Sequence, residues 1–256
     1  NLMVRIGQGL AYNTNPYDKE TNHKNIAFGS KFMSSTYAMI NYKKERIFKN
    51  FGFQAGLSLL HYSNANVKAP NTSINSLTLN AGITYNFDDE DPEYQYNLSD
   101  DEPYKESIKY NIVFRSGINE SDVLGSGQFP FYILSAYVDK RLNRKSAIQF
   151  GVDAFFSNFL KELIYYQSVG FPENDIDADT DYKRLGVFVG HELFVNKLSI
   201  ITQFGFYAYY PYDFEGRIYQ RIGFKRYFGD KWFAAVTLKS HAAKAEAVEL
   251  GIGIRL

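Results

Sequence analysis

Residues 247–256 have the sequence AVELGIGIRL and alternate between apolar positions and positions that are small, charged or glycine. The apolar positions are Val248, Leu250, Ile252, Ile254 and Leu256. Successive side chains of a β-strand point to opposite faces, so a period of two places all five on one face. This stretch therefore predicts a strand with one apolar face and one face of small or charged residues.

The same alternation recurs along the chain, in segments of about ten residues. It is clear in 106–117, 145–156 and 197–209, where the second face again carries polar, charged or glycine residues. A soluble β-sandwich also alternates, with its polar side chains in water. The length and regularity of these strands, with aromatic clusters at strand ends such as FYAYYPY (206–212), favour a transmembrane barrel instead.

Counting these segments gives about thirteen candidate strands. They lie near residues 2–12, 25–33, 36–46, 50–63, 74–87, 106–117, 129–141, 145–156, 183–195, 197–209, 216–227, 231–240 and 247–256. Bacterial barrels have an even number of strands, so about 12–14 are expected in the complete barrel. We predict an all-β fold, a transmembrane antiparallel up-and-down β-barrel. We expect this barrel to form one domain over 1–256, and a barrel that lacks an initial strand is the alternative.

Composition excludes several classes of function. The formal net charge is zero, whereas a nucleic-acid partner requires a basic surface. The chain has no cysteine, and no run of about 18 apolar residues could form a transmembrane helix. Its histidines and acidic residues lack the spacing of a metal site, and nucleotide-binding fingerprints are absent. We therefore expect no metal and no cofactor.

Charged residues on the inner face of the strands are expected to pair inside the barrel. They are Asp153, Glu192, Arg217, Arg221, Lys225, Glu249 and Arg255. Because this set holds charges of both signs, we predict a plugged interior rather than an open pore. Counting strand directions back from a periplasmic C-terminus places the 61–75 connection outside the cell. The same count places the acidic segment 88–106 on the periplasmic side, where we expect a solvated loop.

Residues 61–75, HYSNANVKAPNTSIN, join two of the predicted strands. By the period of two, His61 and Ser63 continue the apolar, lipid-facing side of strand 50–63, and Asn75 lies on the same face of the next strand. Such polar residues are ordinary at a wet strand end. They also fit a serine hydrolase, in which Ser63 is the nucleophile, His61 takes its proton and a third group orients the imidazole.

This stretch resembles the signature of the outer-membrane lipid A 3-O-deacylases, the PagL-type acyloxyacyl hydrolases. The shared pattern is His-x-Ser-Asn-Ala, then Pro-Asn, then the position that Asn75 occupies here. The resemblance covers residues 50–87, and the chain looks like an enlarged branch of the family. It implies that Ser63 is the nucleophile and His61 the general base, with Asn64, Asn66 and nearby backbone N–H groups as the oxyanion hole.

Two positions depart from the family pattern. Asn66 replaces a glycine, and asparagine tolerates left-handed backbone angles best after glycine. Asn75 replaces the catalytic glutamate; it can accept a hydrogen bond from the imidazole but supplies no negative charge. The resemblance thus leaves two alternatives. One is an esterase that removes an ester-linked acyl chain from lipopolysaccharide. The other is a weak or inert barrel that serves as a subunit of a larger outer-membrane protein complex.

The resemblance also implies where the protein resides and what it meets. The expected location is the outer membrane of a Gram-negative bacterium. The expected partner is lipid A of the outer leaflet, with other outer-membrane proteins as further partners under the second alternative.

Overall fold

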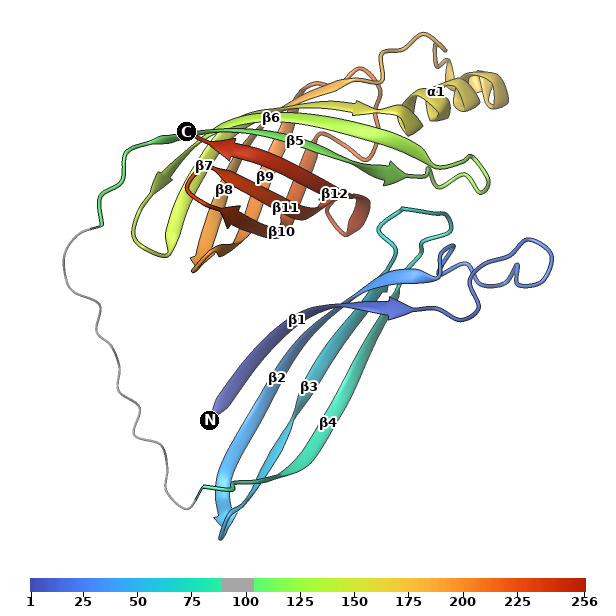
Figure 1. The fold of residues 1–256 in the computed structure, drawn as a ribbon. Helices are drawn as coiled ribbons and strands as arrows, with labels where there is room; N and C mark the ends of the chain where they lie inside the picture. The colour runs from blue at the N-terminus through green and yellow to red at the C-terminus, as the bar shows by residue number, and fades with distance from the viewer. Residues whose placement is uncertain (89–103) are drawn as a thin grey trace. The chain divides into compact units, whose positions relative to one another are not determined.

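The computed structural model describes residues 1–88 and 104–256, and most of its regular structure is β-strand (Figure 1). Its strands are β1 (Leu2–Tyr12), β2 (Phe32–Phe48), β3 (Phe51–Ser63), β4 (Ile74–Tyr85), β5 (Lys109–Asn119), β6 (Phe129–Arg141), β7 (Ser146–Ser157), β8 (Arg184–Val195), β9 (Leu198–Tyr209), β10 (Ile218–Phe228), β11 (Trp232–His241) and β12 (Lys244–Arg255). Helix α1 (Asn158–Gly170) and the short helix η1 (Pro172–Asn174) follow β7. No helix in these two ranges is both long enough and apolar enough to cross a bilayer.

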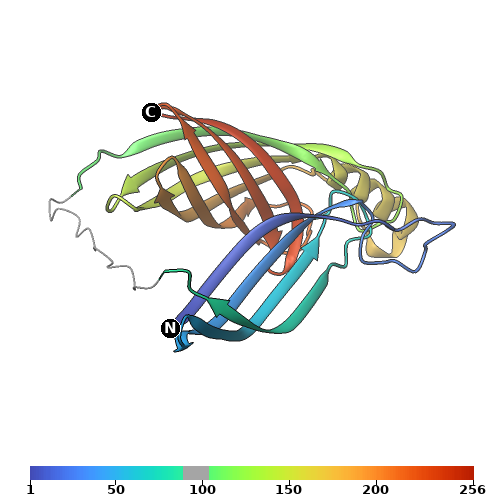
Figure 2. The same ribbon diagram turned by 60° about the horizontal axis from the view of Figure 1, so that its bottom comes forward.

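The chain divides into two compact units. In the described residues, the first comprises 1–64 and 70–88, and the second comprises 65–69 and 104–256. Strands β1 to β4 form an antiparallel sheet in chain order in the first unit. In the second unit, β5 to β12 close into an antiparallel barrel in which β12 pairs with β5 (Figure 2).

The barrel of the second unit has an apolar exterior and a charged interior. The contrast is sharp between neighbours on β12, where Glu249 is 0% exposed and Leu250 is 61% exposed. An apolar outer surface matches the hydrocarbon core of a membrane. A closed barrel also suits that environment because every strand is paired on both edges. The transmembrane antiparallel barrel predicted from the alternation is therefore confirmed as the fold class.

Ion pairs fill the interior of this barrel. Arg221 lies 2.9 Å from Asp153 and 2.6 Å from Glu249, and Lys225 lies 3.1 Å from Glu192. All five side chains are almost completely buried, which is tolerable only because each charge is paired and hydrogen-bonded. The predicted plugged interior is confirmed at these positions.

The two remaining arginines of the predicted interior set behave differently. Arg255 pairs with Asp139 at 2.7 Å, which the sequence did not indicate as a partner. Arg217 instead donates to the backbone oxygen of Tyr207 at 3.4 Å. Aromatic rings also pack in the interior, where the ring centroids of Tyr207 and Tyr219 lie 4.8 Å apart.

The strand predicted at 25–33 is wrong. Residues 25–31 belong to the connection between β1 and β2, and strand pairing begins at Phe32. Gly29 donates its backbone N–H to the Pro70 oxygen at 2.7 Å, and the Ile26 oxygen accepts from the backbone N–H of Thr72 at 3.4 Å. In these contacts, backbone groups of residues 25–31 bond to another loop instead of to a neighbouring strand. The alternation of apolar residues in this segment is too short to favour strand pairing over these loop contacts.

The other predicted strands are present with bounds shifted by a few residues. The described part of the chain holds twelve strands, four in the sheet and eight in the barrel. The single domain over 1–256, with an initial strand missing, stays a prediction. Most of the acidic segment 88–106, expected to form a periplasmic loop, lies outside the described residues.

Candidate active site

Strand register brings three of the expected site residues to one end of one face of the first unit. His61 on β3 lies directly opposite Asn75 on β4. Directly opposed residues of antiparallel strands share a face, and Ser63 lies on the same face two residues after His61. Ser63 in turn pairs with Ser34 on β2. The alternation in the sequence predicts this shared face.

The rest of this face is apolar. Two successive cross-strand rows consist of Val4, Ile40, Leu57 and Leu79, and of Ile6, Ala38, Leu59 and Leu77. These side chains are exposed, as expected for a surface that meets lipid. The opposite face is polar, and there the Asn80 amide donates to the Ser58 hydroxyl at 2.9 Å. His61 and Ser63 thus stand at the end of an apolar band.

The imidazole of His61 is held by Asn75. Its Nδ1 lies 2.7 Å from Asn75 Oδ1. Because this oxygen can only accept, the proton of the neutral ring sits on Nδ1 and Nε2 keeps its lone pair. A free lone pair on Nε2 is what a general base needs, so Asn75 fixes the tautomer that a catalytic histidine requires.

The hydroxyl of Ser63 is held by a residue to which sequence analysis gave no role. Asn71 donates from Nδ2 to Ser63 Oγ at 3.0 Å, and its Oδ1 accepts the backbone N–H of Asn64 at 2.9 Å. The Ser63 hydroxyl also lies 3.2 Å from Asn71 Oδ1. Ser63 and Asn64 are buried, and Asn71 is half-buried. Asn71 is the asparagine of the Pro-Asn pair in the sequence motif. Because it lies in a loop, no strand periodicity indicates which way its side chain points.

The two residues expected in the oxyanion hole lie in different units. Asn64 belongs to the first unit, next to Ser63. Asn66 belongs to the second, where its Nδ2 donates to the Ala245 oxygen at 2.8 Å. Its φ of 59° is left-handed, which explains why asparagine can stand where the family has glycine. The roles expected of Asn64 and Asn66, like those of Ser63, His61 and Asn75, stay predictions.

Two other serine–histidine pairs lie in the second unit. Ser240 and His241 have separate partners, Gln220 and Glu246, as expected for adjacent residues on a strand. Ser146 Oγ lies 2.6 Å from His191 Nε2, a pair the sequence did not reveal. In the described structure no carboxylate or amide is bonded to His191 Nδ1. Of these serine–histidine sets in the described residues, the one around Ser63 has its histidine held through Nδ1 by a side-chain amide oxygen.

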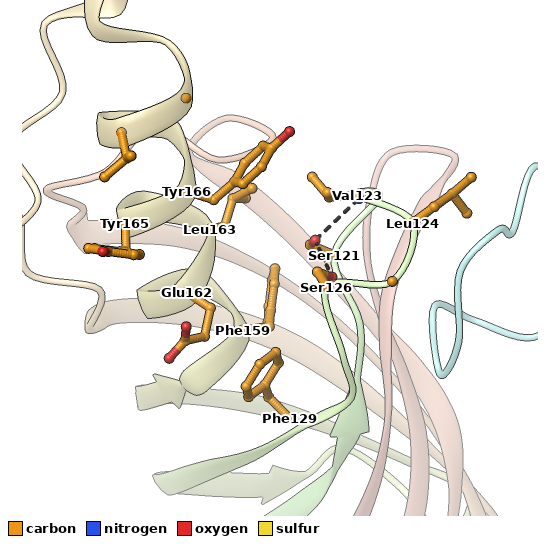
Figure 3. Close-up of a pocket in the computed structure, with 13 residues that line it drawn as sticks. Ser121, Val123, Leu124, Ser126, Phe129, Phe159, Glu162, Leu163, Tyr165 and Tyr166 are labelled. Atoms are coloured by element: carbon orange, nitrogen blue, oxygen red, sulfur yellow. Dashed lines mark hydrogen bonds between the residues drawn. The ribbon is translucent and has the colours of Figure 1, made fainter.

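A cleft of about 470 Å³ in the second unit lies between α1 and the β5–β6 connection (Figure 3). Its walls are largely apolar, including Phe129, Phe159 and Tyr166. The hydroxyls of Ser121 and Ser126 bond to each other at 2.9 Å, and no histidine lines the cleft. Glu162 also lines the cleft, which therefore presents hydroxyl and carboxylate groups among apolar walls.

Replacing Asn71 with alanine is expected to lower the rate of ester hydrolysis about a hundredfold, because a misplaced nucleophile loses the near-attack geometry. The amide of Asn71 links the Ser63 hydroxyl to the Asn64 backbone. The measurement is kcat on a soluble short-chain ester. Asn80→Ala, which removes an amide from the opposite face, is the matched control. Equal rates for the two variants would show that Asn71 does not position Ser63.

Comparison with solved structures gives only weak similarity. A triple mutant of the Rhodopseudomonas blastica porin is 11% identical over 99% of this chain and 100% of its own, with a TM-score of 0.24. Another mutant of that porin is 10% identical over 99% and 100% of the two chains, also with a TM-score of 0.24. At such values the similarity supports no argument. No curated protein matches the chain.

Two family descriptions match the chain and together span nearly all of it. Residues 1–84 match the lipid A 3-O-deacylase family, PagL. Residues 108–256 match the C-terminal domain of acyloxyacyl hydrolases. The first match contains the entire arrangement of Ser63, His61 and Asn75, and the second contains the closed barrel. The chain belongs to the acyloxyacyl hydrolases, the family of the lipid A 3-O-deacylases.

Proposed function

We propose that this protein is an outer-membrane esterase of a Gram-negative bacterium. It removes the ester-linked acyl chain from position 3 of lipid A. The observation that carries the proposal is the 2.7 Å contact between His61 Nδ1 and Asn75 Oδ1, on the same sheet face as Ser63. In this assignment Ser63 is the nucleophile, His61 is the general base and Asn75 holds the base in position.

The reaction proceeds in two steps. In the first, Ser63 Oγ attacks the ester carbonyl while His61 Nε2 takes the hydroxyl proton. The side-chain amide of Asn64 and neighbouring backbone N–H groups stabilise the negative oxygen, and His61 returns the proton to the departing 3-hydroxyl of the sugar. In the second, His61 takes a proton from water, the hydroxide attacks the acyl-serine, and the fatty acid leaves as Ser63 recovers its proton.

The surroundings of the site support a lipid substrate. Apolar rows that include Leu59 and Leu77 lead along the strands to His61 and Asn75. An acyl chain lying on these rows would bring its ester to the level of His61 and Asn75. The membrane itself would supply the substrate, so a deep pocket is unnecessary. This differs from enzymes that bind soluble esters in an enclosed cavity.

Incubation of the purified protein with lipid A in detergent micelles tests the proposal. We expect mass spectrometry to show lipid A species lighter by one 3-hydroxyacyl group, together with the free hydroxy fatty acid. The two products must appear in equal amounts, because hydrolysis yields one of each. Folded protein that leaves lipid A intact over a day of incubation would contradict the esterase assignment.

One observation favours a second candidate function. Asn75 cannot supply the negative charge that stabilises an imidazolium, and loss of such a charge costs a serine protease about ten-thousandfold in rate. The alternative is a weak or inert barrel that serves as a subunit of an outer-membrane complex. Stoichiometric protein partners after mild extraction, combined with intact lipid A, would support this candidate over the first.

A further inference from the structure

A polar row crosses all four strands of the first unit at the level of His61. Its members, from β1 to β4, are Gln8, Thr36, His61 and Asn75. The preceding row on the same face is wholly apolar, so polarity changes within one step along every strand. The esterase mechanism uses only the β3 and β4 members, which leaves Gln8 and Thr36 without a role.

Hydrogen bonds fix the amide of Gln8. Its Nε2 donates to Ser34 Oγ at 2.6 Å, and its Oε1 accepts from Thr36 Oγ1 at 2.6 Å. We call Gln8, Ser34 and Thr36 the amide–hydroxyl cluster. A glutamine side chain loses rotamer freedom when it is held, so two short bonds on an exposed strand indicate a defined orientation rather than a mobile side chain.

The cluster lies beside the proposed catalytic groups. In the strand register, Thr36 is opposite His61 and Ser34 is opposite Ser63. Side chains opposed in this way have Cβ atoms about 5 Å apart. A molecule whose ester reaches Ser63 would therefore extend its neighbouring groups over the cluster.

The chemistry of the cluster selects a neutral polar ligand. Its three side chains carry amide and hydroxyl groups and no formal charge. After its internal bonds, Gln8 Oε1 keeps a second lone pair and the Ser34 hydroxyl keeps its own proton. Hydroxyl and amide groups of a sugar match these sites, whereas a phosphate would be expected to recruit arginine or lysine.

We propose that Gln8, held by Ser34 and Thr36, positions the sugar that carries the ester cleaved at Ser63. This inference rests on the proposed deacylase function and adds to it a residue that selects the saccharide part of the substrate. Gln8 is a positioning residue, because it bonds the sugar and not the reacting carbonyl. Its polar row also sets how deep the sugar lies relative to the apolar band.

The test measures binding without turnover. Ser63→Ala protein in detergent micelles is titrated with lipid A, and the same titration is repeated after adding Gln8→Leu. Leucine suits this face because Ile6 and Leu10 already flank it on β1. We expect Gln8→Leu to weaken lipid A binding about tenfold, the loss typical of one or two hydrogen bonds to a ligand. Gln54→Leu, on the opposite face of β3, is the matched control and should bind as the parent does.

Kinetics on the Ser63-containing protein separate positioning from folding. Gln8→Leu should raise KM for lipid A about tenfold more than it raises KM for a soluble short-chain ester, which has no sugar for Gln8 to bind. Equal binding by the parent and Gln8→Leu would overturn the proposal, as would equal losses on both substrates. Binding that depends on Gln8 in a protein that releases no acyl chain would support the sugar site and reject the deacylase function.

Discussion

Alanine in place of Ser63 will reduce acyl release from lipid A by about a thousandfold or more, which makes this the most damaging single substitution in the protein. The reaction needs an oxygen that can form the acyl-enzyme, and alanine has none. Any remaining rate would come from the oxyanion-stabilising groups and from substrate binding alone. The measurement is the initial rate of 3-hydroxy fatty acid release, followed by mass spectrometry.

Ser58→Ala is the matched control for this substitution. Ser58 is on the same strand and is also buried, but it lies on the opposite face, bonded to Asn80. We expect Ser58→Ala to retain most of the activity. If Ser63→Ala were as active as Ser58→Ala, Ser63 would not be the nucleophile, and a water molecule activated by His61 would become the better hypothesis.

Glutamate in place of Asn75 will raise kcat about a hundredfold or more. Asn75 orients His61 through the 2.7 Å bond but contributes no charge. A carboxylate at the same position would stabilise the imidazolium that forms as Ser63 loses its proton. The reverse change, from aspartate to asparagine, costs a serine protease about ten-thousandfold, so a partial gain is expected in a site that evolved with the amide.

Asn75→Gln separates the effect of charge from the effect of length. Glutamine matches glutamate in size and can also accept a bond from His61, but it remains neutral. We expect it to be no faster than the parent. Equal rates for the two variants would mean that charge at this position does not limit the reaction. A slower glutamate variant would instead favour a site specialised around Asn75.

The sequence predicts strands and faces well because alternation is local. The pattern in β12 is visible without any knowledge of its neighbours, and the exposures of Glu249 and Leu250 follow it. The pairing of His61 with Asn75 could also be anticipated, because one connection links their strands. Closure is different: the pairing of β12 with β5 joins segments far apart in the chain, and alternation alone does not choose between one large ring and a smaller one.

Features that depend on loops or on several strands escaped prediction. Asn71 lies in a connection, where no period tells which way a side chain points. The link from Gln8 to Thr36 becomes visible only when the register of β1 and β2 is known. The error at 25–33 has a similar origin, since the contact of Gly29 with Pro70 is made across two connections. Local sequence carries little information about such contacts.

The pairing of β5 with β12 also has a consequence for biogenesis. Until the last strand docks, the chain segment from β5 to β11 has two open edges, and lipid offers no substitute partner for their backbone groups. Because the closing contacts span more than half of the chain, they form late and slowly. We therefore expect the eight strands to insert into the membrane together, without a stable partly closed barrel. A truncated chain that ends before Lys244 is expected to aggregate, because it lacks the strand that closes the barrel.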